Sequence, residues 1–407
     1  MTNDTASRKG NNIKLVKEAN KYLILQCILK FAPLSTEEIV SRTGLSRPTV
    51  LGVMRELADD QLIARVGYSE SSGGRAAGLW GMDGEGHFAV GVDFEFPQVR
   101  MVIANLKNEI RCAKTLTYPR TIEKTELLER FFQELGDFID LSGVPREAID
   151  GVGLGLPGVI DTVNGVSMNI ERIRGWHDVH IQRDLERHLR LPVYIKNDVH
   201  LMGLTEKRLF LGDEASDFIY IGFRSGIGSV TYQQGRPMKG EKGNAGFIGH
   251  TTLNPAGPAC CCGSRGCLDV YASKLSISAK YMERRRAQGN PPAETPGFID
   301  LVTLARGGDE SAAEVLRDAG FYLGVAVANM IKTVEIPRVV IGGSPAQKQS
   351  VFLEAMEASM KQYLTDSLGV CVSLACGQLP EEKYALGGCL LVFDHLFSKP
   401  KLSLSLV

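Results

Sequence analysis

Four residues in the middle of the chain have the types and spacing of a metal site. His250 is followed by Cys260, Cys262 and Cys267, so one imidazole and three thiols fall within 18 residues. This set matches a closed tetrahedral site of the Cys₃His type that binds Zn²⁺. The alternative is a group of buried free cysteines, but this does not explain why the four residues have the spacing of metal ligands. Because four protein ligands leave no open position for a water molecule, we predict a structural zinc ion, with Cys261 pointing away from it.

A second pair of residues has the chemistry for proton transfer. Asn197 and Asp198 follow the apolar segment 191–195, at the expected end of a strand. A carboxylate in that position is able to accept a proton from a sugar hydroxyl. The alternative is that the pair caps a helix over residues 201–209, and the local sequence on its own favours the cap.

The N-terminal segment has the pattern of a helix-turn-helix unit. Apolar residues recur at helical spacing over residues 20–31. Ser35 and Glu38 form a capping box for a second helix. Gly44 provides a turn residue that tolerates positive φ, and Ser46 is a good N-cap for a third helix. This third helix is expected to bury one apolar face, formed by Val50, Val53, Met54 and Leu57.

The other face of the third helix and the hairpin that follows it predict contacts with DNA. A strand over 63–66, a loop over 67–74 and a strand over 79–82 have the order of a wing. In such a unit the N-terminal end of the third helix enters the major groove of duplex DNA. We expect DNA contacts from Ser46, Arg47, Thr49, Arg55, Gly73, Gly74 and Arg75. A small helical protein-interaction domain is the alternative, but motif order and local basic charge favour DNA.

Composition and charge limit the class of protein. The 407 residues are enough for two or three domains, and 44% of them are hydrophobic. The formal net charge is −1, so nucleic-acid binding must be local; residues 1–82 carry an excess of three positive charges. We expect no secretory signal and no membrane span, because the sequence contains no run of 18 apolar residues. An odd number of cysteines, nine, favours a reducing, cytoplasmic compartment.

The remainder of the chain has the pattern of two α/β units. Apolar strands are expected over 90–93, 99–106, 110–118, 151–156 and 191–195, with a helix over 125–139. A second set begins with a strand over 218–223 and a tight turn over 225–228. Glycine turns are expected at 342–343 and at Leu386–Gly388, of the kind that line a ligand cleft. Strands that alternate with helices predict a mixed sheet in an α/β fold.

Together these motifs resemble the ROK family of repressors and sugar kinases. The resemblance spans nearly the whole chain and rests on Leu156–Gly158, Asn197–Asp198, Ser225–Gly228, Gly246–His250 and the Cys260–Cys267 cluster. It implies a winged helix-turn-helix domain over 1–82 and an actin-like, hexokinase-like body of two lobes. The first lobe would cover 83–205 and be completed by about 385–407, and the second, with the zinc site, 206–384. The sugar would bind to Gly158, Asn197, Asp198, Phe247, His250 and Asp269.

Three departures from the family pattern bear on activity. Family kinases hold ATP phosphate with an Asp-x-Gly-Gly-Thr loop, whereas this chain has Asp93-Phe-Glu-Phe-Pro-Gln98, without glycine and with an acidic residue. Pro97 also removes an amide donor. Phe247 stands where the family has a sugar-binding Glu, and Asp269 replaces another Glu. We therefore expect no catalytic residue and no enzyme activity, although Asp198 matches the kinase general base.

The resulting expectation is a transcriptional repressor of carbohydrate genes, controlled by a sugar or sugar phosphate bound between the lobes. It would bind duplex operator DNA as a homodimer or homotetramer. Two alternatives remain open from the sequence. One is a sugar kinase with an added DNA-binding domain, and the other is a DNA-binding protein whose body does not sense sugar.

Overall fold

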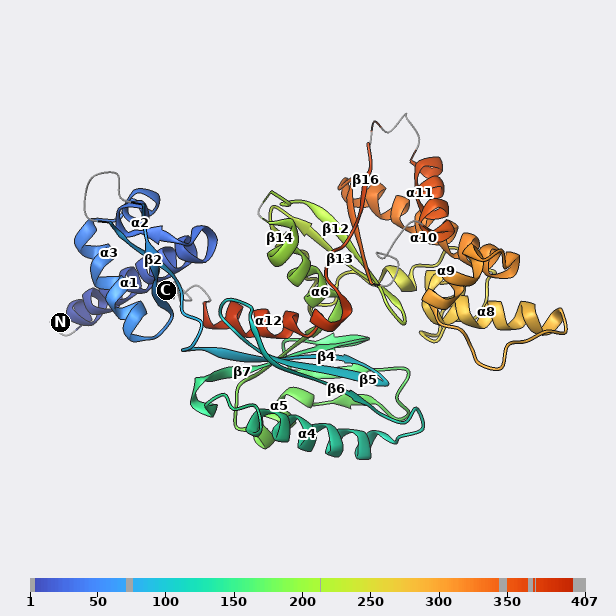
Figure 1. Cartoon of the computed structure of the whole chain (residues 1–407), viewed down its shortest axis with the longest axis horizontal. Coiled ribbons are helices and arrows are strands. Elements are labelled where there is room, and N and C mark those ends of the chain that lie inside the picture. The colour runs from blue at the N-terminus through green and yellow to red at the C-terminus, as the bar shows by residue number, and fades with distance from the viewer. Residues whose placement is uncertain are drawn as a thin grey trace.

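The computed structural model describes residues 4–70, 76–212, 214–343, 350–364, 369 and 371–397, with side chains from residue 15 onward. The N-terminal unit contains three helices, α1 (Asp4–Phe31), α2 (Thr36–Thr43) and α3 (Arg47–Asp59). A small sheet packs beside them in the order β1-β3-β2, formed by β1 (Leu34–Ser35), β2 (Ile63–Tyr68) and β3 (Gly78–Met82). In Figure 1 this unit lies at one end of the molecule, and its core continues into that of the first large sheet.

The predicted capping residues determine where α2 and α3 begin. The Ser35 side chain accepts from the backbone N–H of Glu38, and the Glu38 side chain accepts from the backbone N–H of Ser35, so the capping box is confirmed. Gly44 ends α2 at φ 68°, and Ser46 caps α3 by accepting from the Thr49 amide. The four apolar residues predicted for one face of α3 are all buried.

The first lobe is built on a five-stranded sheet of order β11-β7-β4-β5-β6. Its strands are β4 (Phe88–Glu95), β5 (Gln98–Asn105), β6 (Ile110–Thr117), β7 (Ile149–Leu156) and β11 (Val193–Asn197). Val90, Val92 and Phe94 share a buried cluster with α4 (Lys124–Asp140) and α5 (Ile181–Leu189). Ala89, which points to the opposite face, packs instead with α12 (Leu386–Leu396). A smaller sheet, β10-β9-β8, is made by β8 (Val159–Asp161), β9 (Val166–Asn169) and β10 (His177–Val179).

Helix α12 lies directly on the first sheet, although its sequence is near the end of the chain (Figure 1). A Cβ atom added to Gly91 would lie 2.0 Å from the carbonyl oxygen of Ala385, and one added to Gly153 would lie 2.0 Å from that of Gly388. Glycine therefore permits the close approach of helix and strands. The expectation that Leu386–Gly388 forms a turn lining a cleft is wrong, because these residues lie inside α12 and are buried.

The second lobe contains a sheet of order β14-β13-β12-β15-β16. Its strands are β12 (Phe218–Phe223), β13 (Ile227–Gln233), β14 (Arg236–Pro237), β15 (Arg338–Gly343) and β16 (Ser373–Cys376). Five helices belong to this lobe: α7 (Leu268–Ala272), α8 (Lys274–Ala287), α9 (Phe298–Arg306), α10 (Glu310–Val334) and α11 (Val351–Tyr363). Helix α6 (Asp198–Glu206) packs between the two sheets, against β7 and β11 on one side and β12 and β13 on the other.

The α/β body with two sheet-centred lobes confirms the expected fold class in outline. The predicted strands and the helix over 125–139 are present, most of them with ends shifted by one or two residues. Within the described part of the chain, no helix has the length and apolarity needed to cross a bilayer.

Candidate ligand site between the lobes and metal cluster

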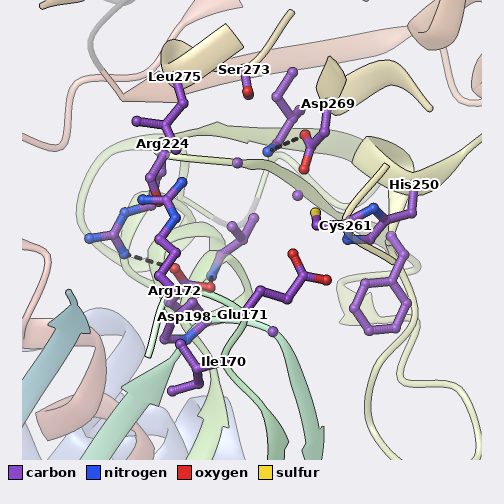
Figure 2. A pocket seen from close by; sticks show the side chains of 18 of the residues that line it. Ile170, Glu171, Arg172, Asp198, Arg224, His250, Cys261, Asp269, Ser273 and Leu275 are labelled. Atoms are coloured by element: carbon purple, nitrogen blue, oxygen red, sulfur yellow. Dashed lines mark hydrogen bonds and ion pairs between the residues drawn. The ribbon is translucent and has the colours of Figure 1, made fainter. Parts of the chain in front are cut away.

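A cavity of about 400 Å³ lies between the two lobes, and both contribute to its walls (Figure 2). Its floor comes from the ends of β7 and β11 and the start of α6, and the opposite wall comes from the β12–β13 turn and from α7 and α8. The structure brings all six sequence-predicted ligand residues to this cavity, namely Gly158, Asn197, Asp198, Phe247, His250 and Asp269.

Local backbone structure explains the positions of Gly158 and Asn197. Gly158 follows β7 at φ 78°, and a Cβ atom there would lie 2.2 Å from the carbonyl oxygen of Asn169, so only glycine fits. Asn197 is the N-cap of α6 and accepts from the backbone N–H groups of Val199 and His200. The capping role considered for the Asn197–Asp198 pair is therefore confirmed for Asn197, while Asp198 lines the cavity at the first turn of the helix.

Arg224, which the sequence did not single out, occupies the centre of the site. It comes directly after β12, in the turn to β13, and its side chain is only 3% exposed. The two terminal nitrogens of its guanidinium lie 2.7 Å from the two carboxylate oxygens of Asp93, and Nη1 is 3.1 Å from Oδ2 of Asp198. Its Nε donates to Glu95 at 2.7 Å. One cation of the second lobe thus binds three carboxylates of the first lobe (Figure 2 shows the contact with Asp198).

The charges in this cluster shift the pKa values of its carboxyl groups in opposite directions. Burial raises the pKa of Asp198 to about 7; Arg224 opposes this rise, and the negative charges of Asp93 and Glu95 add to it. Burial would also raise the pKa of Glu95, but the charges of Arg224 and Lys274, with a hydrogen bond from the Ser225 amide, lower it to about 2. The pKa of Asp198 suits a general base at neutral pH, yet its carboxylate is already engaged by a guanidinium.

The hairpin that carries Asp93 and Glu95 is part of the same cluster. Residues 94–99 form the hairpin between β4 and β5, where Glu95 pairs with Gln98 across the turn. Glu95 accepts from the Ser225 amide at 3.0 Å as well as from Arg224, and Asp93 is also bound by Arg100 at 3.2 Å. Two carboxylates of this hairpin therefore share the buried guanidinium of Arg224.

The remaining walls of the cavity combine apolar side chains, among them Phe247, Ile170 and Leu275, with polar groups. Phe247 is 39% exposed and lies at the cavity edge, where a carboxylate would be expected from the family pattern. The Asp269 carboxylate accepts from the Ile227 amide at 2.9 Å, so this side chain is fixed in place. Arg172 and Glu171 also face the cavity (Figure 2). Within the described residues, Arg172 makes no hydrogen bond or ion pair, and burial lowers its pKa.

The four predicted zinc ligands come together in a loop beside the cavity. The ligand atoms of His250, Cys260, Cys262 and Cys267 all lie within 4.8 Å of one another. The Sγ atoms of Cys262 and Cys267 are 3.7 Å apart, and Sγ of Cys260 is 3.7 Å from Nδ1 of His250. Tetrahedral zinc with usual bond lengths places two sulfurs about 3.8 Å apart, and a sulfur and a nitrogen about 3.6 Å apart. The donor set therefore fits Zn²⁺; the Cys261 thiol is outside this group and lines the cavity.

The four predicted DNA-contacting residues that the structure describes lie on or just before α3. Arg47 and Arg55 are exposed on α3, and Arg47 makes a 2.8 Å ion pair with Glu37 of α2. The hydroxyls of Ser46 and Thr49 are 2.8 Å apart at the exposed start of α3. Gly73, Gly74 and Arg75 lie outside the described residues, between β2 and β3.

Sequence reasoning missed Arg224 and Arg172. A signal was present for Arg224: it is a charged residue between a fully buried strand and a glycine turn. Asp93 and Glu95 belong to one motif and Asp198 to another, so their need for a common cation becomes apparent only when all three are buried together. No comparable signal marks Arg172, which lies in a loop with several charged residues.

Known proteins resemble this chain over almost its whole length. The xylose repressor of Bacillus subtilis (strain 168) is 24% identical over 383 residues, which are 93% of this chain and 96% of the relative. The DNA-binding transcriptional dual regulator NagC of Escherichia coli (strain K12) is 24% identical over 385 residues, which are 94% of each chain. A solved ROK family transcriptional regulator, described as a homologue of the E. coli MLC protein, has a TM-score of 0.80 at 22% identity and covers 94% of this chain and 97% of its own.

Solved sugar kinases resemble a smaller part of the chain. A ROK family glucokinase from Streptomyces griseus, solved with glucose and AMPPNP, has a TM-score of 0.66 at 20% identity. The match covers 98% of the glucokinase but 75% of this chain. Fold and cavity thus define a protein with a hexokinase-like body of two lobes. The chain belongs to the ROK family, whose sequence profile matches residues 89–395, as the motifs predicted.

Proposed function

We propose that this protein is a sequence-specific DNA-binding transcriptional repressor of carbohydrate genes, controlled by a sugar or sugar derivative in the cavity between the lobes. The observation on which this rests is the helix-turn-helix unit, whose third helix exposes Arg47 and Arg55. Regulators match 93–94% of the chain, whereas the glucokinase matches 75%. The family profile begins at residue 89. The N-terminal unit therefore belongs to the part of the chain that the regulators match in addition to the family body.

The N-terminal unit would act as a winged helix-turn-helix domain over residues 1–82. Its contacts with DNA would come from the start of α3 and from the segment between β2 and β3. Residues 83–205 with the C-terminal helix, and residues 206–384, would form the two lobes of the effector-binding body. Operators of such proteins are symmetric, so the active form would be a homodimer or homotetramer.

A sugar kinase is the second candidate, and the Arg224 cluster argues against it. A phosphoryl-transfer site must position phosphate and free a base for the acceptor hydroxyl. Here Arg224 engages Asp198, and the same guanidinium binds Glu95, which lies in the segment where the family resemblance implies a phosphate loop. We therefore propose a non-catalytic body in which Asp198 contributes to effector binding rather than to proton transfer.

The proposed ligand is a sugar held by polar groups from both lobes. Asn197 and Asp269 would hydrogen-bond to hydroxyl groups, Phe247 would pack on an apolar face of the ring, and the unpaired Arg172 would donate to ligand oxygens. Zn²⁺ bound by His250 and the three cysteines would hold the loop that carries this wall of the cavity.

Selection of duplex DNA by the full-length protein tests the proposal. We expect the protein to enrich a symmetric duplex from a random pool. We also expect one member of a panel of sugars and sugar phosphates to raise the melting temperature of the protein and to change its affinity for that duplex. Arg55→Ala should weaken DNA binding, whereas Arg306→Ala, in the second lobe, should not. Absence of any selected duplex would exclude the DNA-binding function, and rapid ATP turnover with a sugar would favour the kinase.

A further inference from the structure

His87 connects the end of helix α3 to the body of the protein. Its Nε2 lies 2.8 Å from the backbone carbonyl oxygen of Asp60, the residue that ends α3. Its Nδ1 lies 2.9 and 3.0 Å from the two carboxylate oxygens of Asp150, near the start of β7. The side chains of His87 and Asp150 are each no more than 20% exposed. One imidazole therefore bridges the proposed DNA-reading helix and the central sheet of the first lobe.

Both partners of this imidazole are hydrogen-bond acceptors. A backbone carbonyl and a carboxylate have no proton to donate, so each ring nitrogen of His87 must supply an N–H. A neutral imidazole has only one N–H, whereas the imidazolium has two. The bridge is therefore complete only when His87 is positively charged. Its position at the C-terminal end of α3 also favours a cation, because the helix dipole is negative there.

The surroundings of His87 favour the charged form. The hydrogen bond to Asp150 raises the pKa of His87 most, and the Asp60 carbonyl and the charges of both aspartates raise it further, against the lowering effect of burial. Lys21 of α1 pairs with the Asp60 carboxylate, and Arg111 of β6 pairs with Glu85 in the preceding turn. The titratable and charged groups that these contacts place around His87 are Lys21, Asp60, Asp83, Glu85, Arg111, Asp150 and Tyr194. Burial raises the pKa of Tyr194 most, and the charges of Glu186 and Asp150 raise it further.

The two strands that meet at His87 both run to the ligand site. His87 immediately precedes β4, whose far end carries Asp93 and Glu95. Asp150 lies in β7, which pairs in parallel with β4 and ends at Leu156, just before Gly158 of the cavity. Seven or eight residues of extended strand span about 20–25 Å. The bridge and the cavity therefore occupy opposite ends of the same pair of strands.

We propose that the His87 imidazolium is a positioning residue that fixes the C-terminal end of α3 on the body, and so couples the orientation of the DNA-reading helix to the sheet that carries the ligand site. This inference rests on the proposed DNA-binding function. Among the described residues, other contacts at this junction do not involve a titrating group: the Asp83 amide donates to the Leu62 carbonyl oxygen at 3.0 Å, Gly86 packs against Gln61, and apolar side chains of the N-terminal unit share a buried cluster with those of the body. At His87, by contrast, protonation alters the attachment of the helix.

The first test needs no DNA. Amide hydrogen exchange is measured on the full chain for the wild type, His87→Gln and His177→Gln, at pH 6.5 and 8.5, with correction for intrinsic exchange. His177 is an exposed histidine on β10 and serves as the matched control. Glutamine keeps a neutral donor but has neither charge nor a second ring N–H. We expect exchange over residues 57–68 to be three- to tenfold faster in His87→Gln at pH 6.5, and the difference from the wild type to shrink at pH 8.5.

The second test measures affinity for a duplex that the wild type selects from a random pool. His87→Gln and Asp150→Asn should each bind about three- to tenfold more weakly at pH 6.5. Wild-type affinity should fall toward theirs as pH rises above 6.5 and the imidazolium is lost, while His177→Gln follows the wild type. Equal exchange in His87→Gln and His177→Gln at both pH values would overturn the proposal. If the wild type selects no duplex, the DNA-binding function fails, and the exchange measurement still decides whether His87 fixes α3.

Discussion

Replacing Arg224 by Met should test whether the buried cluster connects the two lobes. Methionine has a similar length but removes the charge, and it leaves Asp93, Glu95 and Asp198 without their shared cation. Removing one partner of a buried ion pair lowers the free energy of unfolding by about 3–5 kcal/mol. For lobes of this size that corresponds to a fall in melting temperature of roughly 6–20 °C. The surface pair Arg208–Asp394 provides the control, since Arg208→Met should change stability by about 1 kcal/mol or less.

The effect of Arg224→Met should depend on pH in a defined direction. Without the guanidinium, the pKa of Asp198, already about 7 in the wild type because of burial, should rise further. A carboxyl group whose folded-state pKa exceeds its unfolded value binds more protons in the folded state, so stability falls as pH rises between the two values. The variant should therefore lose more stability at pH 8 than at pH 6.

Calorimetry or denaturant unfolding of the full chain at pH 6 and pH 8 measures this difference. Adding Glu95→Gln and Asp198→Asn to Arg224→Met removes two of the unpaired charges and should restore most of the loss at pH 8. Arg224→Met with the stability of the wild type at pH 8 would refute the argument, because a guanidinium binding three buried carboxylates could not then be holding the lobes.

Two further predictions concern the metal and the DNA-binding surface. Cys262→Ser should reduce bound zinc well below one ion per chain and lower the melting temperature, because structural zinc contributes directly to folding. Cys371→Ser, which changes an exposed cysteine outside the cluster, is the control. Elemental analysis that finds no zinc in the wild type would contradict this prediction. Arg47→Ala should bind the selected duplex about five- to thirtyfold more weakly than the wild type. Its melting temperature should be unchanged, because Glu37, the ion-pair partner of Arg47, is exposed. Equal affinity of the variant and the wild type at physiological salt would show that Arg47 does not contact DNA.

Local patterns predicted the elements well where each signal lies within a few residues. The capping box at Ser35, the αL turn at Gly44 and the N-cap at Ser46 depend only on neighbours along the chain, and each occurs as predicted. Helix α1 begins at Asp4, well before the predicted residue 20, because residues 4–19 lack an apolar stripe for periodicity to detect. Leu386–Gly388 was misread because glycine in a helix is usually unfavourable, and here close packing on Gly91 and Gly153 requires it.

The sequence motifs predicted which segments form the ligand site, but not the ion pairs between Arg224 and the three carboxylates. The four predicted metal ligands lie within 18 residues, so their spacing alone indicates a shared site. The partners of Arg224 come from the end of β4 and the start of α6, 131, 129 and 26 residues away, and only the approach of the two lobes brings them together. The sequence marks Glu95 only as an acidic residue in the place of a phosphate loop, whereas in the structure its carboxylate binds Arg224 and the Ser225 amide. Acidic residues on one lobe and a cation on the other thus form an internal ion cluster beside the cavity, which no pattern of neighbouring residues predicts.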